Sequence, residues 1–438
     1  MEKKYFYIKT YGCQMNVYDS DRISASMLDQ GFLATQQADQ ADVILLNTCH
    51  IREKAAEKIY SELGRFKPLK KQKPEMKIGV VGCVAQAEGK EIIARQPLVD
   101  VVVGPQSYTE LPDLLQKSNE KPQVLTEFPR DDKFSRLPSH IAQIKSPSAF
   151  LTIQEGCDKF CSFCVVPYTR GAENSRPIDQ VINEAKAMVE NGVREITLLG
   201  QNVNAYQGDS AIGKQSLADL IYKLASIDDL KRIRYTTSHP NDMSDDLMMA
   251  HRDIDKLMPY LHLPIQSGSN AILKAMNRKH TRETYLKIID TLRNLRPDMA
   301  ISGDFIVGFP GESDKDFQDT LDLVKQIGYA QAYSFKYSTR PGTPAVKKEQ
   351  ISEEVKSERL QELQNLLNAQ QQSFQSDLVG KDLTVLIEKQ GREKAQMTGR
   401  SDYLIPVHIT GNQDDVGKIF SVNITKNYKN SLQGEIIH

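Results

Sequence analysis

The 438-residue sequence lacks an excess of charge, a long apolar run and a segment with the features of a signal peptide. Its 56 lysines and arginines are matched by 57 aspartates and glutamates, so bulk charge does not predict a polyanionic partner. No apolar stretch is long enough to cross a bilayer, and residues 1–10 have no apolar core of signal-peptide type. We therefore expect a cytoplasmic protein that is not associated with a membrane.

Cysteine is also scarce, with six in the chain. An even number in a secreted protein would suggest disulfides, but cytoplasmic thiols stay reduced and are available to metals. The six cysteines form two groups of three. One group lies in a short loop, and the other is spread along the first part of the chain: Cys157, Cys161 and Cys164, and Cys13, Cys49 and Cys83.

The loop group has the spacing C-x3-C-x2-C, which brings three thiolates together from one short segment. Thiolates suit zinc, copper and iron–sulfur clusters. A structural zinc is almost always four-coordinate, and no fourth Cys or His follows at the spacing of a zinc finger. A [4Fe–4S] cube on three cysteines would leave one iron open to an exogenous ligand. A zinc knuckle and a redox-active pair of Cys161 and Cys164 remain the alternatives.

Residues 1–118 alternate apolar strand-like runs with helical segments, which predicts an α/β domain with a parallel sheet. The predicted strands are Tyr5–Thr10, Val43–Thr48, Ile78–Gly82 and Val101–Gly104, and the predicted helices are Asp19–Gln30 and Ile51–Gly64. Cys13, Cys49 and Cys83 each follow a different strand. Ligands bind at the carboxyl ends of such strands, so these thiols can form a second three-cysteine cluster site. The alternative is three unrelated buried cysteines.

Residues 119–148 contain four prolines and a mixed-charge stretch, and we predict a linker there. From residue 149 to residue 375, strands and helices alternate again, which predicts a partial (β/α)6 barrel. The predicted strands are Phe150–Gln154, Glu195–Gly200, Ile233–Thr237, Tyr260–Pro264, Ala300–Val307 and Ala332–Tyr337.

Small and polar residues follow each barrel strand, where a barrel of this kind binds its ligands. They could bond an amino acid and a ribose, although the same residue types also dominate ordinary turns. We expect His239 to be a packing or polar-network residue. The candidates for ligand binding are Gly200, Gln201, Asn202, Ser238, Gln266 and Ser267.

The remaining sequence predicts a long helix over residues 350–375 and a small all-β barrel over residues 376–438. The strand-like runs of this barrel are Leu383–Glu388, Met397–Ser401 and Ile419–Val422. Barrels of this size often bind RNA, although the composition alone does not establish it.

Four motifs together resemble the methylthiotransferase family of radical S-adenosylmethionine (SAM) enzymes: Lys9–Ser20, Asn47–Ala55, Val81–Cys83 and Gln154–Gly171. The resemblance covers the chain as a methylthiotransferase N-terminal domain (1–118), a radical SAM core (149–375) and a TRAM-like RNA-binding domain (376–438). The first two motifs are similar to the branch that modifies isopentenylated adenosine in tRNA. Gly200-Gln201-Asn202 replaces the Gly-Gly-Glu motif common to radical SAM enzymes.

The resemblance implies two [4Fe–4S] clusters and two SAM molecules per turnover. The cluster on Cys157, Cys161 and Cys164 would cleave SAM, and the auxiliary cluster on Cys13, Cys49 and Cys83 would present methylated sulfur. The six candidate residues at the strand ends would then bind SAM. The implied reaction is methylthiolation of C2 of N6-dimethylallyladenosine beside the anticodon of tRNA. C2–H is unactivated, so the cofactors must carry this step.

The implied partners are the anticodon stem-loop of tRNA, an electron donor such as flavodoxin or ferredoxin, and a sulfur donor, with the chain acting as a monomer. We expect Arg170, Arg176 and Arg340 to contact phosphates, the alternative being ordinary surface or salt-bridged arginines.

Two other functions stay open. Sibling methylthiotransferases modify threonylcarbamoyladenosine in tRNA or an aspartate of a ribosomal protein. A non-enzymatic RNA-binding adaptor with structural zinc is the alternative from a different class.

Overall fold

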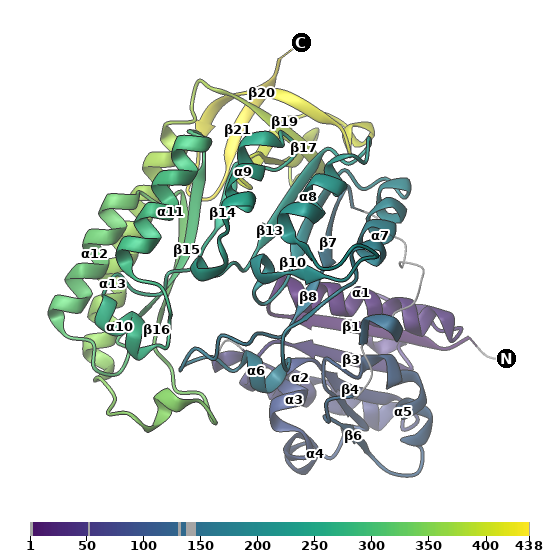
Figure 1. Cartoon of the computed structure of the whole chain (residues 1–438). Helices are drawn as coiled ribbons and strands as arrows, with labels where there is room; N and C mark the ends of the chain where they lie inside the picture. The colour runs from purple at the N-terminus through teal and green to yellow at the C-terminus, as the bar shows by residue number, and fades with distance from the viewer. Residues whose placement is uncertain (1–2, 51–52, 130–132, 137–145, 438) are drawn as a thin grey trace. The chain divides into compact units, whose positions relative to one another are not determined.

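A computed structural model describes residues 3–50, 53–129, 133–136 and 146–437 (Figure 1). The chain forms two compact units. The first unit comprises Met1–Gln143, Glu155–Asp158 and Val165–Asn174, and the second comprises Ile144–Gln154, Lys159–Cys164 and Ser175–His438. No helix among the described residues is both long and apolar enough to cross a membrane.

The first unit is built on a parallel sheet of six strands within the described part of the chain, in the order β2-β1-β3-β4-β5-β6. All four predicted strands are present, and β2 and β6 are additional. β6 lies inside the predicted linker, so that part of residues 119–148 belongs to the sheet. Residues 130–132 and 137–145 of the linker lie outside the described residues. The strands are β1 (Tyr5–Tyr11), β2 (Leu33–Ala34), β3 (Val43–Thr48), β4 (Lys77–Val81), β5 (Val101–Val103) and β6 (Gln123–Leu125).

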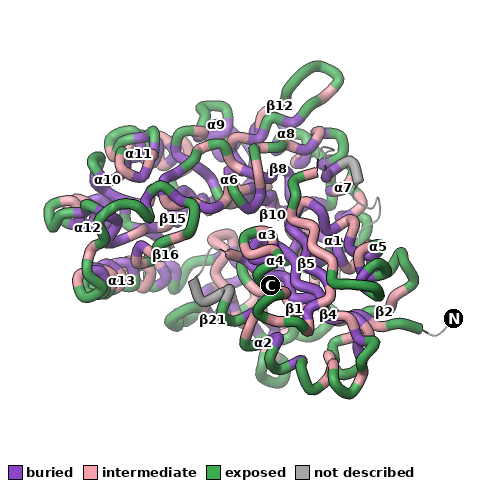
Figure 2. The backbone as a smooth tube through the Cα atoms, turned by 90° about the horizontal axis from the view of Figure 1, so that it is seen from below, coloured by how far each residue is buried: buried purple, intermediate pink, exposed green. Residues whose placement is uncertain are grey.

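Helices cover both faces of this sheet. Alternate strand residues point to opposite faces, so Ile44 and Leu46 pack with α2, α3 and α4, while Val43 and Leu45 pack with α1 and α5. Burial on both faces explains the continuous apolar runs of β3 and β5, and Figure 2 colours β5 as buried. The helices are α1 (Gln14–Asp29), α2 (Glu53–Gln72), α3 (Cys83–Glu88), α4 (Lys90–Arg95) and α5 (Leu111–Lys117).

The second unit contains an open arc of six parallel strands, as predicted for a partial barrel. Two three-stranded sheets, β7-β10-β13 and β14-β15-β16, are joined by one bridge between Ile233 and Leu257. The strands are β7 (Ser148–Thr152), β10 (Glu195–Leu199), β13 (Arg232–Thr236), β14 (Tyr260–His262), β15 (Ala300–Val307) and β16 (Gln331–Lys336).

Helices follow the strands of the arc, and α11, α12 and α13 lie outside β14–β16 in Figure 1. The predicted helix at 350–375 is α13, whose buried Leu363 and Leu367 lie on the side that faces the arc. The helices are α7 (Ile178–Glu190), α8 (Leu217–Ala225), α9 (Asp245–Asp253), α10 (Asn270–Ala275), α11 (Arg282–Leu295), α12 (Asp314–Ile327) and α13 (Glu353–Ser376). Shorter elements are α6 (Val166–Thr169), β8 (Gln154–Glu155), β9 (Asn174–Ser175), β11 (Gln207–Gly208) and β12 (Gln215–Ser216).

The C-terminal strands close into a small barrel in the order β17-β18-β19-β21-β20, drawn in yellow in Figure 1. Closure leaves the sheet without an exposed edge. The predicted all-β barrel is therefore confirmed, with β19 and β21 as strands that the sequence did not indicate. The strands are β17 (Asp382–Gln390), β18 (Gln396–Ser401), β19 (Pro406–Thr410), β20 (Ile419–Asn427) and β21 (Leu432–Ile436).

Two buried arginines of β13, its first and third residues, attach this small barrel to the arc. Arg232 donates to the carbonyl of Arg400 (2.8 Å) and pairs with Asp402 (3.0 Å). Arg234 donates to the carbonyls of Ser401 (2.8 Å) and Asp402 (2.7 Å). Neither arginine is at the carboxyl end of β13, so the small barrel is attached away from that end of the strand.

We predict that Arg232→Ala destabilises the second unit strongly. The variant leaves the Asp402 carboxylate without its buried cation, a change that typically costs about 3–5 kcal/mol. The measurement is calorimetric unfolding. Arg252→Ala is the matched control, because Arg252 pairs with Asp253 on the exposed surface of the same unit, where such a pair contributes at most about 1 kcal/mol. Equal losses in the two variants would contradict the prediction.

Candidate functional site

The three cysteines of the first unit stand at the ends of neighbouring strands. Cys13 precedes α1 just after β1, Cys49 directly follows β3, and Cys83 begins α3 after β4. The sheet order places β1, β3 and β4 side by side. Because all three strands run parallel, their carboxyl ends share one edge, where the sequence analysis expected the thiols to meet.

Glycines allow the chain to pack tightly at this edge. Gly12 has a φ of +117°, and a Cβ there would lie 2.2 Å from the Cβ of Cys49. Gly82 has a φ of +89°, and a Cβ there would lie 2.4 Å from Oδ1 of Asn47. A larger residue at either position would displace its neighbour. Both Gly-Cys pairs lie within the motifs that carry the family resemblance, but the close packing of the glycines was not predicted.

The Cys13 thiol is more acidic than an ordinary cysteine. The pKa of Cys13 is lowered to about 6, chiefly by a hydrogen bond with Cys49, and the positive charge of Arg170 lowers it further while burial opposes the shift. An unperturbed thiol has a pKa of about 8.5. Cys13 is therefore mostly a thiolate at neutral pH, which is the form that binds soft metals.

A buried asparagine pair supports Cys13. The side chain of Asn47 donates to the carbonyl of Asn16 (2.8 Å), and the side chain of Asn16 donates to Oδ1 of Asn47 (3.0 Å). Oδ1 of Asn16 also accepts from Sγ of Cys13 (3.3 Å). The pair links α1 to β3 and fixes the start of α1, which directly follows Cys13. Neither asparagine was predicted from the sequence to be part of the site.

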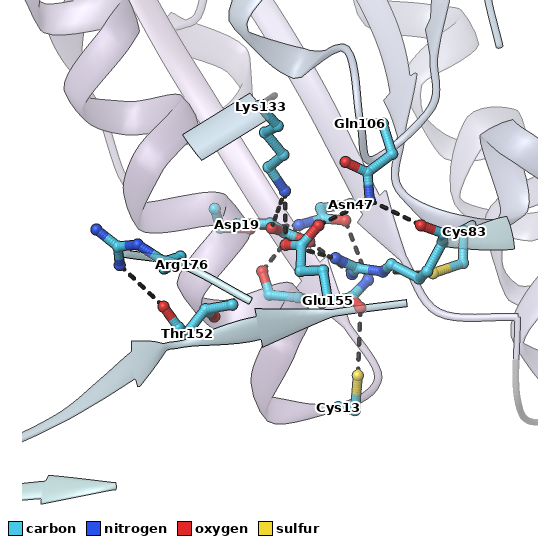
Figure 3. Close-up of polar contacts among 12 residues, drawn as sticks. Cys13, Asp19, Asn47, Cys83, Gln106, Lys133, Thr152, Glu155 and Arg176 are labelled. Carbon is cyan, nitrogen blue, oxygen red and sulfur yellow. Dashed lines mark hydrogen bonds and ion pairs between the residues drawn. The ribbon is translucent and has the colours of Figure 1, made fainter. Parts of the chain in front are cut away.

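Four charged side chains are buried together beside the cysteines. Lys133, Asp19 and Glu155 point toward one another in Figure 3, with Lys133 Nζ 2.7 Å from Glu155 and 3.4 Å from Asp19. Arg170 pairs with Asp19 (2.6 Å) and Glu155 (3.3 Å), and its Nε donates to Sγ of Cys83 (3.4 Å). Burial raises the pKa of the Cys83 thiol, and the charge of Arg170 acts in the opposite direction.

These contacts correct two predictions of RNA binding. Arg170 and Arg176 are each 3% exposed, so neither presents a guanidinium to a phosphate. Arg176 instead donates to the carbonyl of Thr152 (2.9 Å) and pairs with Glu184 (2.8 Å). Position near a strand end indicated a binding role, but residue type alone does not reveal burial. Arg340 is half-buried and stays a predicted phosphate contact.

The loop with the C-x3-C-x2-C spacing is divided between the two units after Asp158. In the first unit, the amide of Cys157 donates to the carbonyl of Gly171 (3.3 Å). In the second unit, Nη1 of Arg278 lies 3.7 Å from Sγ of Cys161, and the amide of Cys164 donates to the carbonyl of Cys161 (2.9 Å). Each part of the loop is therefore anchored in its own unit.

The donor atoms of the cysteine sites fit an iron–sulfur cluster in their chemistry. Thiolates are the usual ligands of such clusters, and the lowered pKa of Cys13 favours the ligating form. Across the described part of the chain, no three Cys, His, Asp or Glu side chains are already gathered as a metal site. Cys13 and Cys49 are joined by a hydrogen bond, and Cys83 begins α3 at the end of the neighbouring strand β4.

The predicted SAM-binding residues of the second unit lie at the carboxyl ends of the arc. Oε1 of Gln154 accepts from the amides of Gln201 (2.9 Å) and Asn202 (3.1 Å), and a Cβ on Gly200 would lie 2.5 Å from that oxygen. Gly200 therefore serves a tight turn after β10. The side chain of Asn202 also donates to Asp242 (2.9 Å), which pairs with Lys159.

Of the remaining candidates, Ser267 has a structural hydrogen bond in a turn, whereas the hydroxyl of Ser238 has none within the described part of the chain. Ser267 is buried, and its hydroxyl accepts from the amide of Ser269 (3.2 Å), which is a turn role. Gln266 has a φ of +81°. The buried hydroxyl of Ser238 has no hydrogen-bond partner among the described residues. His239 accepts from the amide of Asn241 (3.2 Å) and so serves the predicted polar network. SAM binding by these residues stays a prediction.

Sequence models of three families match the chain in order. They are the uncharacterized protein family UPF0004 over residues 5–104, the radical SAM superfamily over residues 151–324 and the TRAM domain over residues 377–437. The parallel arc and its cysteine loop, preceded by an α/β domain and followed by a closed barrel, define a radical SAM protein of three-part architecture.

Curated relatives narrow this class. A tRNA-2-methylthio-N(6)-dimethylallyladenosine synthase of Ruegeria sp. (strain TM1040) is 60% identical over 99% of both chains. A protein of the same name from Cereibacter sphaeroides (strain ATCC 17029) is 58% identical over 99% of both chains. The chain belongs to the family of these synthases.

Solved structures share the fold at low identity. The cobalamin-dependent radical SAM enzyme OxsB aligns with a TM-score of 0.56 at 12% identity. The alignment covers 83% of this chain and 56% of the OxsB chain. The radical SAM methyltransferase TsrM from Kitasatospora setae aligns with a TM-score of 0.58 at 11% identity, covering 79% of this chain and 77% of that one. This likeness concerns the fold alone.

We predict that iodoacetamide alkylates Cys13 faster than Cys83 in metal-free protein at pH 7. The pKa of Cys13 is lowered to about 6, so its thiolate forms as the pH rises through 6, whereas burial raises the pKa of Cys83. Peptide mass spectrometry of partially labelled protein from pH 5 to pH 9 gives both rates. A Cys13 rate that still climbs steeply above pH 8, or that does not exceed the Cys83 rate, would contradict the prediction.

Proposed function

We propose that this chain methylthiolates C2 of N6-dimethylallyladenosine beside the anticodon of tRNA. The observation that carries the proposal is the full-length identity of about 60% with proteins named for that product. The six cysteines support it, because two three-thiol sets match the need for a radical source and a sulfur carrier. The placement of Cys13, Cys49 and Cys83 at one sheet edge suits the second of these tasks.

The proposal assigns Cys13, Cys49 and Cys83 to an auxiliary [4Fe–4S] cluster and Cys157, Cys161 and Cys164 to the SAM-cleaving cluster. When bound, the clusters and two SAM molecules per turnover supply a 5'-deoxyadenosyl radical and a methylated sulfur, which no side chain can supply. The protein's own contribution is to hold these groups and exclude water.

The strand ends of the second unit are suited to holding SAM. The side chain of Gln154 holds the turn after β10 by accepting from the amide of Gln201, and it leaves no room for a Cβ at Gly200. This turn lies at the carboxyl end of β10. The unpartnered hydroxyl of Ser238 is available to a ligand there. Lys159 and Asp242 form an ion pair (2.7 Å) that orders the segment just before Cys161.

The small C-terminal barrel is proposed to bind the anticodon stem-loop. Its attachment through Arg232 and Arg234, the first and third residues of β13, lies away from the strand ends where SAM would bind. It would thus contact the RNA away from the reacting base, with Arg340 nearer to it. We further propose a cytoplasmic monomer that receives electrons from a flavodoxin or ferredoxin and sulfur from a separate donor.

We predict that Cys13→Ala abolishes the methylthio product and retains SAM cleavage, because the two cysteine sets have separate tasks. After anaerobic reconstitution the wild type should hold about eight irons and the variant about four. Cys161→Ala is the matched comparison and should lose both cleavage and product. Product formation by Cys13→Ala, or loss of its 5'-deoxyadenosine, would contradict the assignment.

We predict that a strain lacking the gene loses the methylthio group from isopentenylated adenosine and from no other tRNA nucleoside. Nucleoside mass spectrometry measures this, and the chain supplied on a plasmid should restore the modification while the Cys13→Ala variant should not. Loss of methylthiolated threonylcarbamoyladenosine would indicate the sibling activity. Reconstituted protein that holds zinc and no iron would overturn the enzymatic proposal.

A further inference from the structure

Arg170 is held by hydrogen bonds at both its guanidinium and its backbone carbonyl. Its Nη2 and Nη1 bond the carboxylates of Asp19 (2.6 Å) and Glu155 (3.3 Å), and all three side chains are 2% exposed. Gln106 donates to Glu155 (2.8 Å) and to the carbonyl of Arg170 (2.9 Å). The backbone and the guanidinium are therefore held by the same small network.

This arrangement determines the direction of the remaining donor. A guanidinium is planar, so two carboxylates on its Nη atoms also set the orientation of Nε–H. That hydrogen points at Sγ of Cys83, with an N–S distance of 3.4 Å. Lys133 balances the second carboxylate (2.7 Å to Glu155), so the buried group of two cations and two anions is neutral before any thiolate forms.

Burying four charges is unfavourable unless each is paired, and a packed apolar group at this place would usually be no less stable. The desolvation of these four charges therefore makes the network a poor source of folding stability. The network also reaches a proposed cluster ligand, through the bond from Nε of Arg170 to Sγ of Cys83. This contact is the reason to look for a role in the cofactor site.

We propose that Arg170 is a positioning residue for the auxiliary cluster, holding the Cys83 sulfur through Nε–H and raising the reduction potential of the cluster with its charge. The inference rests on the proposed function, because it assumes that Cys83 binds iron. Hydrogen bonds to cluster sulfurs and local charge both tune such potentials. Groups that orient ligands from behind typically account for about 10–100-fold in metal affinity.

The chain position of Arg170 gives the contact a second consequence. Arg170 lies in the segment Val165–Asn174, which follows the last cysteine of the C-x3-C-x2-C loop and belongs to the first unit. The polypeptide that supplies the SAM-cleaving ligands thus continues directly into the support of the auxiliary site. One segment of chain serves both cysteine sets.

The test uses full-length chain carrying Cys157→Ala, Cys161→Ala and Cys164→Ala, so that only the auxiliary cluster can form. Arg170→Gln in this background keeps N–H donors and removes the charge. We expect a more negative midpoint in a redox titration followed by electron paramagnetic resonance, and roughly tenfold or faster iron release to a chelator. Arg176→Gln removes an equally buried arginine of the second unit and should change neither quantity.

A second variant covers the case in which Arg170→Gln does not fold. Arg170→Lys retains a cation for Asp19 and Glu155 but has no planar fork to aim at Cys83, so iron release should still accelerate while the potential stays closer to that of the parent. Unchanged release and potential in a folded Arg170 variant would overturn the inference alone. A parent chain that binds no auxiliary iron would instead overturn the proposed function.

Discussion

Parallel pairing of β1, β3 and β4 is the constraint on which the first unit depends. The register pairs Tyr11 with Thr48 and Asn47 with Val81, so the three strands end within about one residue of each other. Residues that follow them are then brought together whatever their separation in sequence. A slip of one residue in any strand would reverse the faces of its side chains and displace the cysteine that follows it.

Buried polar groups then determine what the strand ends can do. The asparagine pair and the charged network of Arg170 occupy space that apolar side chains could fill at lower cost in desolvation. Each reaches a thiol, Cys13 in one case and Cys83 in the other. The polar interior at this edge is therefore organised around sulfur, while the two apolar layers on either side of the sheet supply the stability.

The sequence predicted those features that a long apolar run or a motif can report. Val43–Thr48 is buried throughout and was predicted to the residue, and the cysteines were placed correctly at the strand ends. Two-residue β2 and three-residue β6 are too short to carry a pattern, and the β19 and β21 strands of the small barrel follow turns that the sequence did not separate. The burial of Arg170 could not be predicted, because Asp19 and Glu155 lie far from it along the chain. The asparagine pair was missed for the same reason.

The attachment of the small barrel also affects how the family can change. Across the joint, Arg232 and Arg234 bind three backbone carbonyls and the Asp402 carboxylate within residues 400–402, and Arg232 also donates to the hydroxyl of Thr384 (2.7 Å). Thr384 and Asp402 contribute their side chains to these contacts, whereas the carbonyl acceptors are present whatever the residue type. Most positions on the strands of the small barrel can therefore change without loss of its attachment to the arc. The surface of the small barrel can thus vary in sequence while its position on the arc is kept.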